Sequence, residues 1–536
     1  MSDNTPSSLT PHIISFFKAL TTNQKIIDLA SNIQQNLQQG HTCIAYKNSI
    51  DDRLISPDGN SGYIVQHNNK AGFRNFYNQE NYIRSEFLNS SKPSIDFDKL
   101  NNVYKNVYKD IQKTSKAGDT EGIDLQWQAS VEFLLHSRFI LCGGPGTGKT
   151  TTVMRMLLIY QSLYPEHKIV LAAPTGKAAN RLMQSIKANA TSLNINPAMQ
   201  EILSITAQTL HRLLGYNPQN NKFKYHQKNP LLYDLVIIDE SSMLDISMTY
   251  TLLKALKPNA KLVLIGDKNQ LPAVGIGNVF ADLCHLNRQT QVTTNILKQL
   301  EQGININNCP TSNYIELNRN YRFIAGSIVA RLAAAMLNRD FPQLLSYKNQ
   351  PNFIWNNPAN KQDKNKLLID WYKSIPAGET SVLLSPTNFG ENSVDELNKL
   401  ALQIIYKNKQ KSENMPVMVT KNDYTLNIFN GDIGHMQWLD DKWYVAFMSE
   451  TTTQHIQLDA IHQWQIAHAI SIHKSQGSEY DHVLIAIPEN LENKILTNQL
   501  LYTAITRAKS SVTLWASDAI MNEIINTKAQ RMTFLN

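Results

Sequence analysis

Several short segments of this chain have residue types and spacings that suit chemistry on a nucleoside triphosphate. Residues 143–150 read GGPGTGKT, which matches the phosphate-loop pattern GxxxxGK[ST]. Such a loop needs glycines so that backbone N–H groups face phosphate oxygens at a helix N-terminus. It also needs a lysine for the β and γ oxygens and a hydroxyl for Mg²⁺. We therefore expect ATP to be held by Gly143, Gly144, Pro145, Gly146, Thr147, Gly148, Lys149, Thr150 and Thr151.

An acidic pair and an amide follow two later apolar runs. Asp239 and Glu240 end the run LVII, so we expect Asp239 to hold Mg²⁺ with Thr150 and Glu240 to orient the attacking water. Gln270 lies in the loop that follows the apolar run KLVLIGD. Its side-chain amide could form a hydrogen bond with the γ-phosphate or its water and so signal hydrolysis to a part of the protein that binds DNA. Taken alone, an acidic pair or a polar loop is also typical of a protein surface. Their order after the phosphate loop favours catalysis.

Two arginines lie much further along the chain. Arg322 is in RNYRF at 319–323, and Arg507 is in LLYTAITRAK at 500–509. Phosphoryl transfer needs cations around the transferring group beyond one lysine and one metal, so both arginines are candidates to complete the site from a second lobe. The alternative for each is a surface salt bridge.

These segments must be positioned by an α/β fold. The short apolar runs FILCG, KIVLAAP, DLVIID and KLVLIGD alternate with helical stretches, which predicts a parallel sheet covered by helices. Functional groups collect at the carboxyl ends of such strands. The alternation returns after an Asn-rich stretch at 303–313 and predicts a second lobe. We expect a first motor lobe over 111–311 and a second over 312–536.

Two regions lie outside this alternation. Residues 1–110 read as mainly helical, with one helix starting near Thr22 and ending at Gly40, and suit either a docking domain or a structural cap. Residues 412–465 alternate apolar and polar types around an Asn430-Gly431 turn, which predicts a small β-barrel insertion. A basic, aromatic hairpin at 220–230 suits either DNA contact or a plain connection.

Composition sets outer limits on the function. The 536 residues carry a formal net charge of +7, a modest excess that favours an anionic partner. The four cysteines are too far apart for a CxxC pair, and no basic, apolar leader opens the chain, so we expect a cytoplasmic protein without a zinc site. The sequence shows no nuclease constellation.

Together the motifs resemble superfamily 1 helicases of the 5′-to-3′ branch, and most closely the RecD family, the alpha subunit of exodeoxyribonuclease V. The resemblance spans roughly residues 124–515. It rests on WQAS at 127–130, GGPGTGKT at 143–150, APTGKAANRL at 173–182, TLHRLLG at 209–215, VIIDESSMLD at 236–245, GDKNQLP at 266–272, NYRF at 320–323, PVMVTKND at 416–423, FNGDIG at 429–434, HKSQGSEYDHV at 473–483 and LLYTAITRAK at 500–509.

The resemblance implies two RecA-like motor lobes and an ATP-driven 5′-to-3′ translocase on single-stranded DNA. It also implies a complex with RecB-like beta and RecC-like gamma subunits that acts in double-strand break repair, recombination and degradation of linear DNA. By this resemblance Gln128 would read adenine, and Gly477 and Glu479 would approach the nucleotide. The residues implied to line the DNA strand are Thr175, Lys177, His211, His473 and Lys474.

Two other functions stay open at this stage. A free-standing helicase of the same branch would unwind DNA without partner subunits. A regulatory subunit would bind DNA without productive hydrolysis. A protein without hydrolysis has no physical need for all of the residues that argue against it, which are Lys149, Thr150, Asp239, Glu240, Arg322 and Arg507. Affinity for single strands should fall with salt in either case, because phosphate contacts release counterions.

Overall fold

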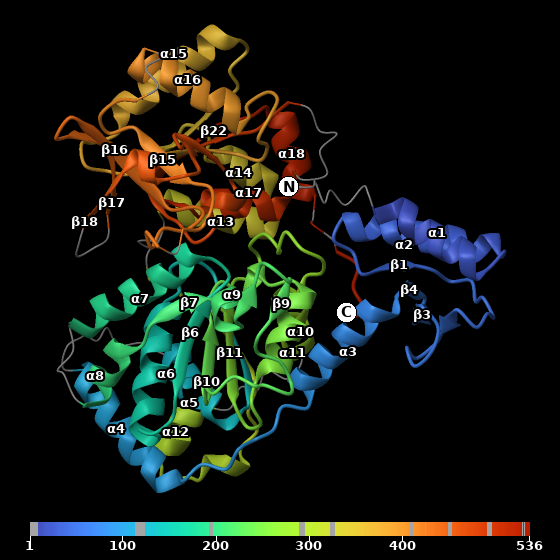
Figure 1. The fold of residues 1–536 in the computed structure, drawn as a ribbon. Coiled ribbons are helices and arrows are strands. Elements are labelled where there is room, and N and C mark those ends of the chain that lie inside the picture. Colours follow the sequence, from blue (N-terminus) through green and yellow to red (C-terminus); the bar gives the residue numbers. More distant parts are fainter. Residues whose placement is uncertain are drawn as a thin grey trace.

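Two parallel sheets form the frame of the molecule, one in each of two stacked lobes, with an N-terminal unit beside the first (Figure 1). The computed structural model describes residues 9–112, 124–191, 197–288, 295–321, 327–407, 411–423, 425–448, 453–489, 496–527, 529 and 531–535. Within these residues no helix has both the length and the apolar character needed to cross a bilayer.

The first lobe contains a six-stranded sheet in the order β12-β5-β11-β10-β6-β7, in which every neighbouring pair is parallel. Its central strands are buried on both faces, which explains the continuous apolar runs in the sequence. The strands are β5 (Arg138–Gly143), β6 (Ile169–Ala173), β7 (Ala207–Thr209), β10 (Leu235–Ile238), β11 (Lys261–Gly266) and β12 (Tyr314–Leu317).

Helices cover this sheet and connect its strands. The helices are α5 (Leu125–Glu132), α6 (Lys149–Leu163), α7 (Gly176–Thr191), α8 (Pro197–Ser204), α9 (Leu210–Leu213), α10 (Ile246–Ala255), α11 (Val279–Arg288) and α12 (Ile296–Glu301), with 3-10 turns η2 (Phe133–Leu135), η3 (Ser241–Met243) and η4 (Ile306–Asn308). A short hairpin of β8 (Tyr216–Asn217) and β9 (Lys222–Phe223) precedes β10, close to where the sequence predicted one.

The predicted boundary between residues 311 and 312 is wrong. Strand β12 pairs in parallel with β5, so the first lobe extends to Leu317. The four residues YIEL were too short and too mixed to signal a strand, and only the distant partner β5 completes the pairing.

The second lobe contains a five-stranded parallel sheet in the order β13-β22-β21-β14-β20. The second α/β lobe predicted from the sequence is therefore confirmed. Its elements are α13 (Ile328–Asn338), α14 (Phe341–Ser346), β13 (Phe353–Asn356), α15 (Lys361–Ser374), β14 (Ser381–Ser385), α16 (Val394–Tyr406), β20 (Ala469–Ser471), η6 (His473–Ser475), β21 (Tyr480–Ala486), α17 (Asn498–Ile505), β22 (Ala508–Trp515) and α18 (Asp518–Asn526).

The insertion in the second lobe is an antiparallel sheet, as expected, but the predicted barrel is not confirmed. Its strands follow the open order β18-β17-β16-β15-β19, and no pairing closes β18 onto β19 within the described residues. The two-residue hairpin lies at Asp440-Asp441, where both residues have positive φ, whereas Gly431 turns the loop before β16. The elements are β15 (Pro416–Val419), β16 (Ile433–Leu439), β17 (Lys442–Met448), β18 (Thr453–Gln457), η5 (Leu458–Ala460) and β19 (Trp464–Ile466).

The N-terminal unit has the predicted helices and also a small sheet that the sequence did not reveal. The second helix begins at Gln24, buries the expected apolar face and ends before Gly40. The sheet has the order β1-β4-β3-β2, and its strands are too short to show alternation. The elements are α1 (Leu9–Leu20), α2 (Gln24–Gln38), β1 (Cys43–Ala45), β2 (Ile55–Ser56), β3 (Ile64–His67), β4 (Lys70–Phe73) and α3 (Arg74–Leu88). The next helix, α4 (Phe97–Gln112), packs on α6 and belongs to the first lobe (Figure 1).

The segment after α18 returns from the second lobe to the N-terminal unit (Figure 1). The carbonyl of Met532 accepts a hydrogen bond from the Thr42 amide at 2.9 Å, and Phe534 donates to the buried Glu80 carboxylate at 2.9 Å. Leu535 is fully buried in the same apolar cluster as Ile83 and the first-lobe sheet. This segment therefore fastens the N-terminal unit to the first lobe.

Candidate active site

The phosphate loop connects β5 to α6 and has the curvature that its glycines allow. Gly146 and Gly148 adopt φ of +77° and +84°. The left-handed backbone of Gly148 would strain any other residue, and a Cβ there would lie 2.0 Å from the Gln126 amide nitrogen and would displace that side chain. The Lys149 ammonium donates to the Gly143 and Gly144 carbonyls at 2.8 and 3.0 Å, inside the curve of the loop. The loop thus presents a cradle for phosphate oxygens.

The first turn of α6 completes this cradle. Thr150 and Thr151 are partly exposed there, and Thr147 donates its hydroxyl to the Gly144 carbonyl at 2.8 Å. The N-terminus of a 15-residue helix adds a partial positive charge and backbone donors without helical partners. An anionic ligand would be stabilised at this point.

The acidic pair lies where β10 ends. Asp239 accepts a hydrogen bond from the Glu240 amide at 2.8 Å, and Glu240 has a left-handed backbone with φ of +51°. Burial and the neighbouring Glu240 charge raise the pKa of Asp239 to about 6, although Lys149 opposes the shift. A cation would offset this concentrated negative charge.

These residues fit Mg²⁺. A threonine hydroxyl and a carboxylate are the oxygen ligands that Mg²⁺ prefers, and phosphates and waters usually complete its shell. Among the described residues no group of three His, Cys, Asp or Glu side chains forms a metal cage. The predicted pair of Thr150 and Asp239 therefore suits a nucleotide-bound magnesium rather than a dedicated metal centre.

The loop after β11 adds two buried polar groups to this edge of the sheet. Gln270 is buried, and its Oε1 atom has no hydrogen-bond partner among the described residues. Burial raises the pKa of Asp267, while Lys149 opposes the shift. A buried amide oxygen without a partner is costly, so this position suits a ligand or an ordered water.

The second lobe reaches this edge through α17. Tyr502 donates its hydroxyl to Asp267 at 3.0 Å, and the same oxygen lies 3.2 Å from the position of a Cβ on Gly144. Thr503 accepts a hydrogen bond from the Leu271 amide at 3.0 Å. Both lobes therefore contribute to one site around the phosphate loop.

Of the two predicted arginines, the structure describes Arg507 but not Arg322. Arg507 is buried and donates to the Thr503 carbonyl at 3.0 Å and the Ser478 carbonyl at 3.3 Å, and its charge lowers the pKa of Asp267 against the larger effect of burial. Arg322 lies outside the described residues. The residues before it contact the phosphate loop: Asn320 donates to the Pro145 carbonyl, and the Tyr321 amide donates to Gly146, both at 2.7 Å.

Comparison with known proteins agrees with this two-lobed site. A family model for an AAA domain matches residues 126–276, and one for a UvrD-like helicase C-terminal domain matches residues 466–515. The RecBCD enzyme subunit RecD of Haemophilus influenzae is 31% identical over 481 residues, covering 79% of this chain and 74% of the relative. This chain belongs to the RecD family.

Other relatives are similar over much of their length. The RecBCD enzyme subunit RecD of Mycolicibacterium smegmatis is 30% identical and aligns over 77% of this chain and 74% of its own. The ATP-dependent RecD2 DNA helicase of Deinococcus radiodurans is 30% identical over 71% of this chain and 47% of its own. A crystal structure of Pif1 helicase from Candida albicans aligns with 75% of this chain and 97% of its own at 16% identity and a TM-score of 0.43.

The glutamine assigned to adenine in this RecD family member is buried on α5. Gln128 donates to Glu132 on its own helix at 3.3 Å. Two residues earlier, Gln126 donates to the Thr147 carbonyl at 3.0 Å and so reaches the phosphate loop directly. Sequence reasoning missed Gln126, because its role depends on how α5 packs against the loop.

The residues implied to line the DNA strand follow the carboxyl ends of three strands. Thr175 follows β6 and caps α7 by accepting from the Ala178 amide at 3.2 Å. Exposed His211 follows β7, the parallel neighbour of β6. His473 and Lys474 form η6 after β20 in the second lobe, and burial is the main cause of a lowered pKa in both. The two sets therefore lie on the strand ends of facing lobes.

Lys177 and Gly477 mark two places where the lobes meet. Lys177 donates to the Gly431 carbonyl of the β insertion at 3.5 Å. Gly477 has φ of +72°, and its carbonyl accepts from Arg181 of the first lobe at 3.1 Å. Glu479 forms an ion pair with the same Arg181.

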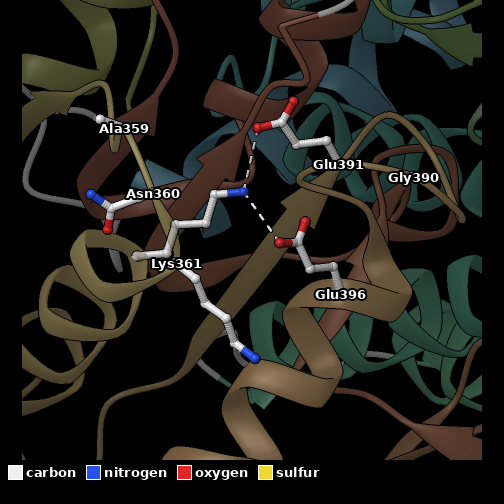
Figure 2. Close-up of a pocket in the computed structure, with 7 residues that line it drawn as sticks. Ala359, Asn360, Lys361, Gly390, Glu391 and Glu396 are labelled. Atoms are coloured by element: carbon white, nitrogen blue, oxygen red, sulfur yellow. Dashed lines mark hydrogen bonds and ion pairs between the residues drawn. The ribbon is translucent and has the colours of Figure 1, made fainter.

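A separate pocket of about 420 Å³ lies in the second lobe, where α15 begins and the loop before α16 passes (Figure 2). Lys364 forms ion pairs with Glu396 at 3.2 Å and with Glu391 at 3.6 Å. With Lys361, the lining has two cations and two anions, so it offers no net charge to a nucleotide. This pocket is an internally paired cluster, distinct from the interlobe site.

Proposed function

We propose that this RecD family member is an ATP-dependent 5′-to-3′ DNA helicase that acts as the alpha subunit of a RecBCD-type helicase–nuclease complex. The observation that carries the proposal is the hydrogen bond that Tyr502 of the second lobe donates to Asp267 of the first, on the side of Gly144 where a Cβ would point. It joins the two lobes at the position where nucleotide would bind, so ligand binding and lobe closure are linked. The RecD relatives named as RecBCD subunits support the assembly.

The residues of the first lobe would perform hydrolysis. Lys149 would exchange its loop carbonyls for the β and γ phosphate oxygens, and Glu240 would orient the attacking water. When bound, Mg²⁺ would be held by Thr150 and Asp239 and would neutralise charge on those oxygens. Gln270, with its buried amide oxygen, would sense the γ-phosphate or its water.

The second lobe would supply positive charge as the cleft closes. Arg507 lies directly after α17, the helix that contacts Asp267, and its guanidinium is held by two carbonyls of its own lobe. The chain leading to Arg322 is bonded to the phosphate loop, which supports the same role for that residue. Because Arg507 belongs to the other lobe, turnover would require closure of the cleft, and closure would be reversed after hydrolysis.

The strand path would run across both lobes. Thr175, Lys177 and His211 would contact DNA from the first lobe, and His473 and Lys474 from the second. Alternate opening and closing of the lobes would move this path along a single strand. A chromosomal substrate implies that the protein works in the cytoplasm.

The N-terminal unit, made of α1–α3 and the β1–β4 sheet, is the proposed docking region for a gamma-like subunit. Phe16 and Tyr63 are exposed on it and stack edge to face at 5.2 Å. Aromatic side chains of this kind are enriched where proteins associate. The relatives named as RecBCD subunits make a partner subunit the expected occupant.

The deciding experiment is unwinding of partial duplexes that carry either a 5′ or a 3′ single-stranded tail. The purified chain is measured alone and after mixing with beta and gamma subunits, with ATP present in each case. We expect unwinding from 5′ tails that rises with the partners. Unwinding at full rate by the chain alone would indicate a free-standing helicase, and binding without hydrolysis would indicate a regulatory subunit.

A further inference from the structure

Arg181 on α7 reaches from the first lobe to the second. Its Nη1 atom donates to the Gly477 carbonyl at 3.1 Å, and its Nη2 atom forms an ion pair with the Glu479 carboxylate. The Arg181 side chain is 36% exposed and that of Glu479 only 14%, so water screens the pair incompletely. One guanidinium thus binds two groups of the opposite lobe.

The second lobe is shaped to receive this contact. Gly477 has a left-handed backbone with φ of +72°, which aims its carbonyl toward α7. A Cβ placed on Gly477 would lie 3.5 Å from the Cβ of Ala178, one helical turn before Arg181. Residues three apart lie on the same face of a helix, so Ala178 and Arg181 form one continuous surface that contacts the turn at residues 477–479.

Arg181 also lies in the electric field of the hydrolysis site. Burial works against its charge, but Glu479, Glu240 and Asp239 together outweigh burial and raise the pKa of Arg181. The acidic pair of its own lobe and the glutamate of the other lobe therefore attract the same guanidinium. This arrangement makes the contact sensitive to charge at the end of β10.

Helix α7 connects Arg181 to the proposed strand path. Its first turn carries Lys177, which donates to the Gly431 carbonyl of the β insertion at 3.5 Å. Gly176 lies against the Phe429 ring so closely that a Cβ would come within 2.4 Å of it. Arg181 follows Lys177 by four residues on the same helix, so a shift of the first two turns of α7 would move both contacts together.

We propose that Arg181 is a positioning residue, the cross-lobe latch that holds the cleft closed and couples contact with the DNA strand to ATP turnover. The proposal rests on the proposed helicase function. The latch consists of Arg181, the Gly477 carbonyl and the Glu479 carboxylate. It must break each time the lobes separate, so its strength sets how much of the population is closed.

The test compares Arg181→Ala and Arg181→Lys with Lys187→Ala, which removes an exposed cation further along the same helix. Two readouts are used in the full chain: the distance between one dye on each lobe, measured by single-molecule fluorescence transfer, and ATP turnover with and without single-stranded DNA. Thermal unfolding of each variant verifies the fold.

We expect Arg181→Ala to reduce the closed population and the DNA-stimulated turnover about tenfold, with turnover in the absence of DNA changed less than twofold. Arg181→Lys should recover part of both, because the ion pair is kept while the planar fork is lost. Added salt should open the unsubstituted protein more than Arg181→Ala.

An unchanged dye distance in Arg181→Ala would overturn the latch, as would an equal effect of Lys187→Ala. A parallel loss of stimulated and basal turnover would also overturn it, since Arg181 would then serve the chemistry itself. If the unsubstituted chain hydrolyses no ATP in response to DNA, the proposed function fails, while the distance measurement still decides whether the latch exists.

Discussion

Two junctions hold this molecule together, and they differ in chemistry. The N-terminal unit joins the first lobe through apolar side chains: Ile83, Phe87 and Leu535 belong to the same buried cluster as strands β10 and β11. Opening this junction would expose apolar surface, which costs about 25 cal/mol for each Å². The N-terminal unit should therefore move with the first lobe as one body.

The cleft between the lobes is joined around the phosphate loop by polar contacts. Tyr502 binds Asp267, Thr503 binds the Leu271 amide and Arg181 binds Glu479. Water replaces such partners readily, so each contributes only about 1 kcal/mol net. The difference in chemistry indicates that the junction between the N-terminal unit and the first lobe stays closed, whereas the junction between the two lobes can open.

The largest effect is expected from breaking the permanent junction. Phe534→Ala removes a ring that is 6% exposed and packs edge to face on Tyr77 at 5.0 Å. The cavity should lower the free energy of unfolding by about 3–5 kcal/mol, measured by denaturant titration. Met532→Ala, at a side chain 36% exposed, is the control. A loss below 1 kcal/mol would mean that this segment does not fasten the unit.

The next effect belongs to the cleft. Lys149→Gln removes the cation that faces the phosphate oxygens, so DNA-stimulated ATP turnover should fall at least about a hundredfold. The melting temperature should change little, because among the described residues the ammonium donates hydrogen bonds to carbonyls of its own loop and its charge otherwise only offsets those of Asp239 and Asp267. Lys168→Gln, at an exposed lysine of the same lobe, controls for a general charge effect. Undiminished turnover in Lys149→Gln would refute the assigned site.

A smaller effect tests the charge buried in the permanent junction. Burial raises the pKa of Glu80 to about 8 from an ordinary value of 4.5, so the folded protein binds a proton that the unfolded chain has lost. The free energy of unfolding should therefore fall as pH rises from about 4.5 to about 8.

Glu80→Gln mimics the protonated carboxyl and should remove this dependence, with a gain of roughly 1–3 kcal/mol at pH 8. Its amide oxygen can still accept from Phe534, and its NH₂ group can donate to Thr42. Thermal unfolding across this pH range measures the effect, with Glu523→Gln on the exposed face of α18 as the control. An identical pH profile in Glu80→Gln would show that Glu80 is already ionised.

The smallest effect is expected from removing one hydrogen bond between the two lobes. Tyr502→Phe removes one hydrogen bond to Asp267, which keeps a second bond from the Asn269 amide at 2.9 Å. The closed population should fall about twofold to tenfold, as expected for a net 0.5–1.5 kcal/mol. Fluorescence transfer between dyes on the two lobes measures it, with the exposed Tyr216→Phe as control. An unaltered distance distribution would argue that α17 contributes by packing alone.

Much of the first half of the site could be predicted from sequence. Lys149 and Thr150 are placed by a strand, a loop and a helix that are consecutive in the chain, and Asp239 needs only the end of its own strand. Local order fixes such groups, because parallel strands flanked by helices bring their carboxyl ends to one edge.

Elements that depend on distant partners were not predictable. Strand β12 is four residues long and exists because β5 pairs with it. Apolar and polar residues alternate along the insertion as they do in the strands of a barrel. This alternation does not indicate whether the strand at one edge of the sheet pairs with the strand at the other edge. Gln126 precedes WQAS and Arg181 lies within APTGKAANRL, but neither motif states what the side chain contacts. Their roles arise from α5 packing on the phosphate loop and α7 packing on the second lobe.

The sequence by itself determined the parallel strands, the phosphate loop and the acidic pair, because each follows from apolar runs and turn residues within one βα unit. Only the tertiary structure decided how the lobes meet, where the first lobe ends and what the segment 531–535 fastens. Those outcomes depend on contacts between residues hundreds of positions apart, and such contacts leave no periodic signal in the residues that make them.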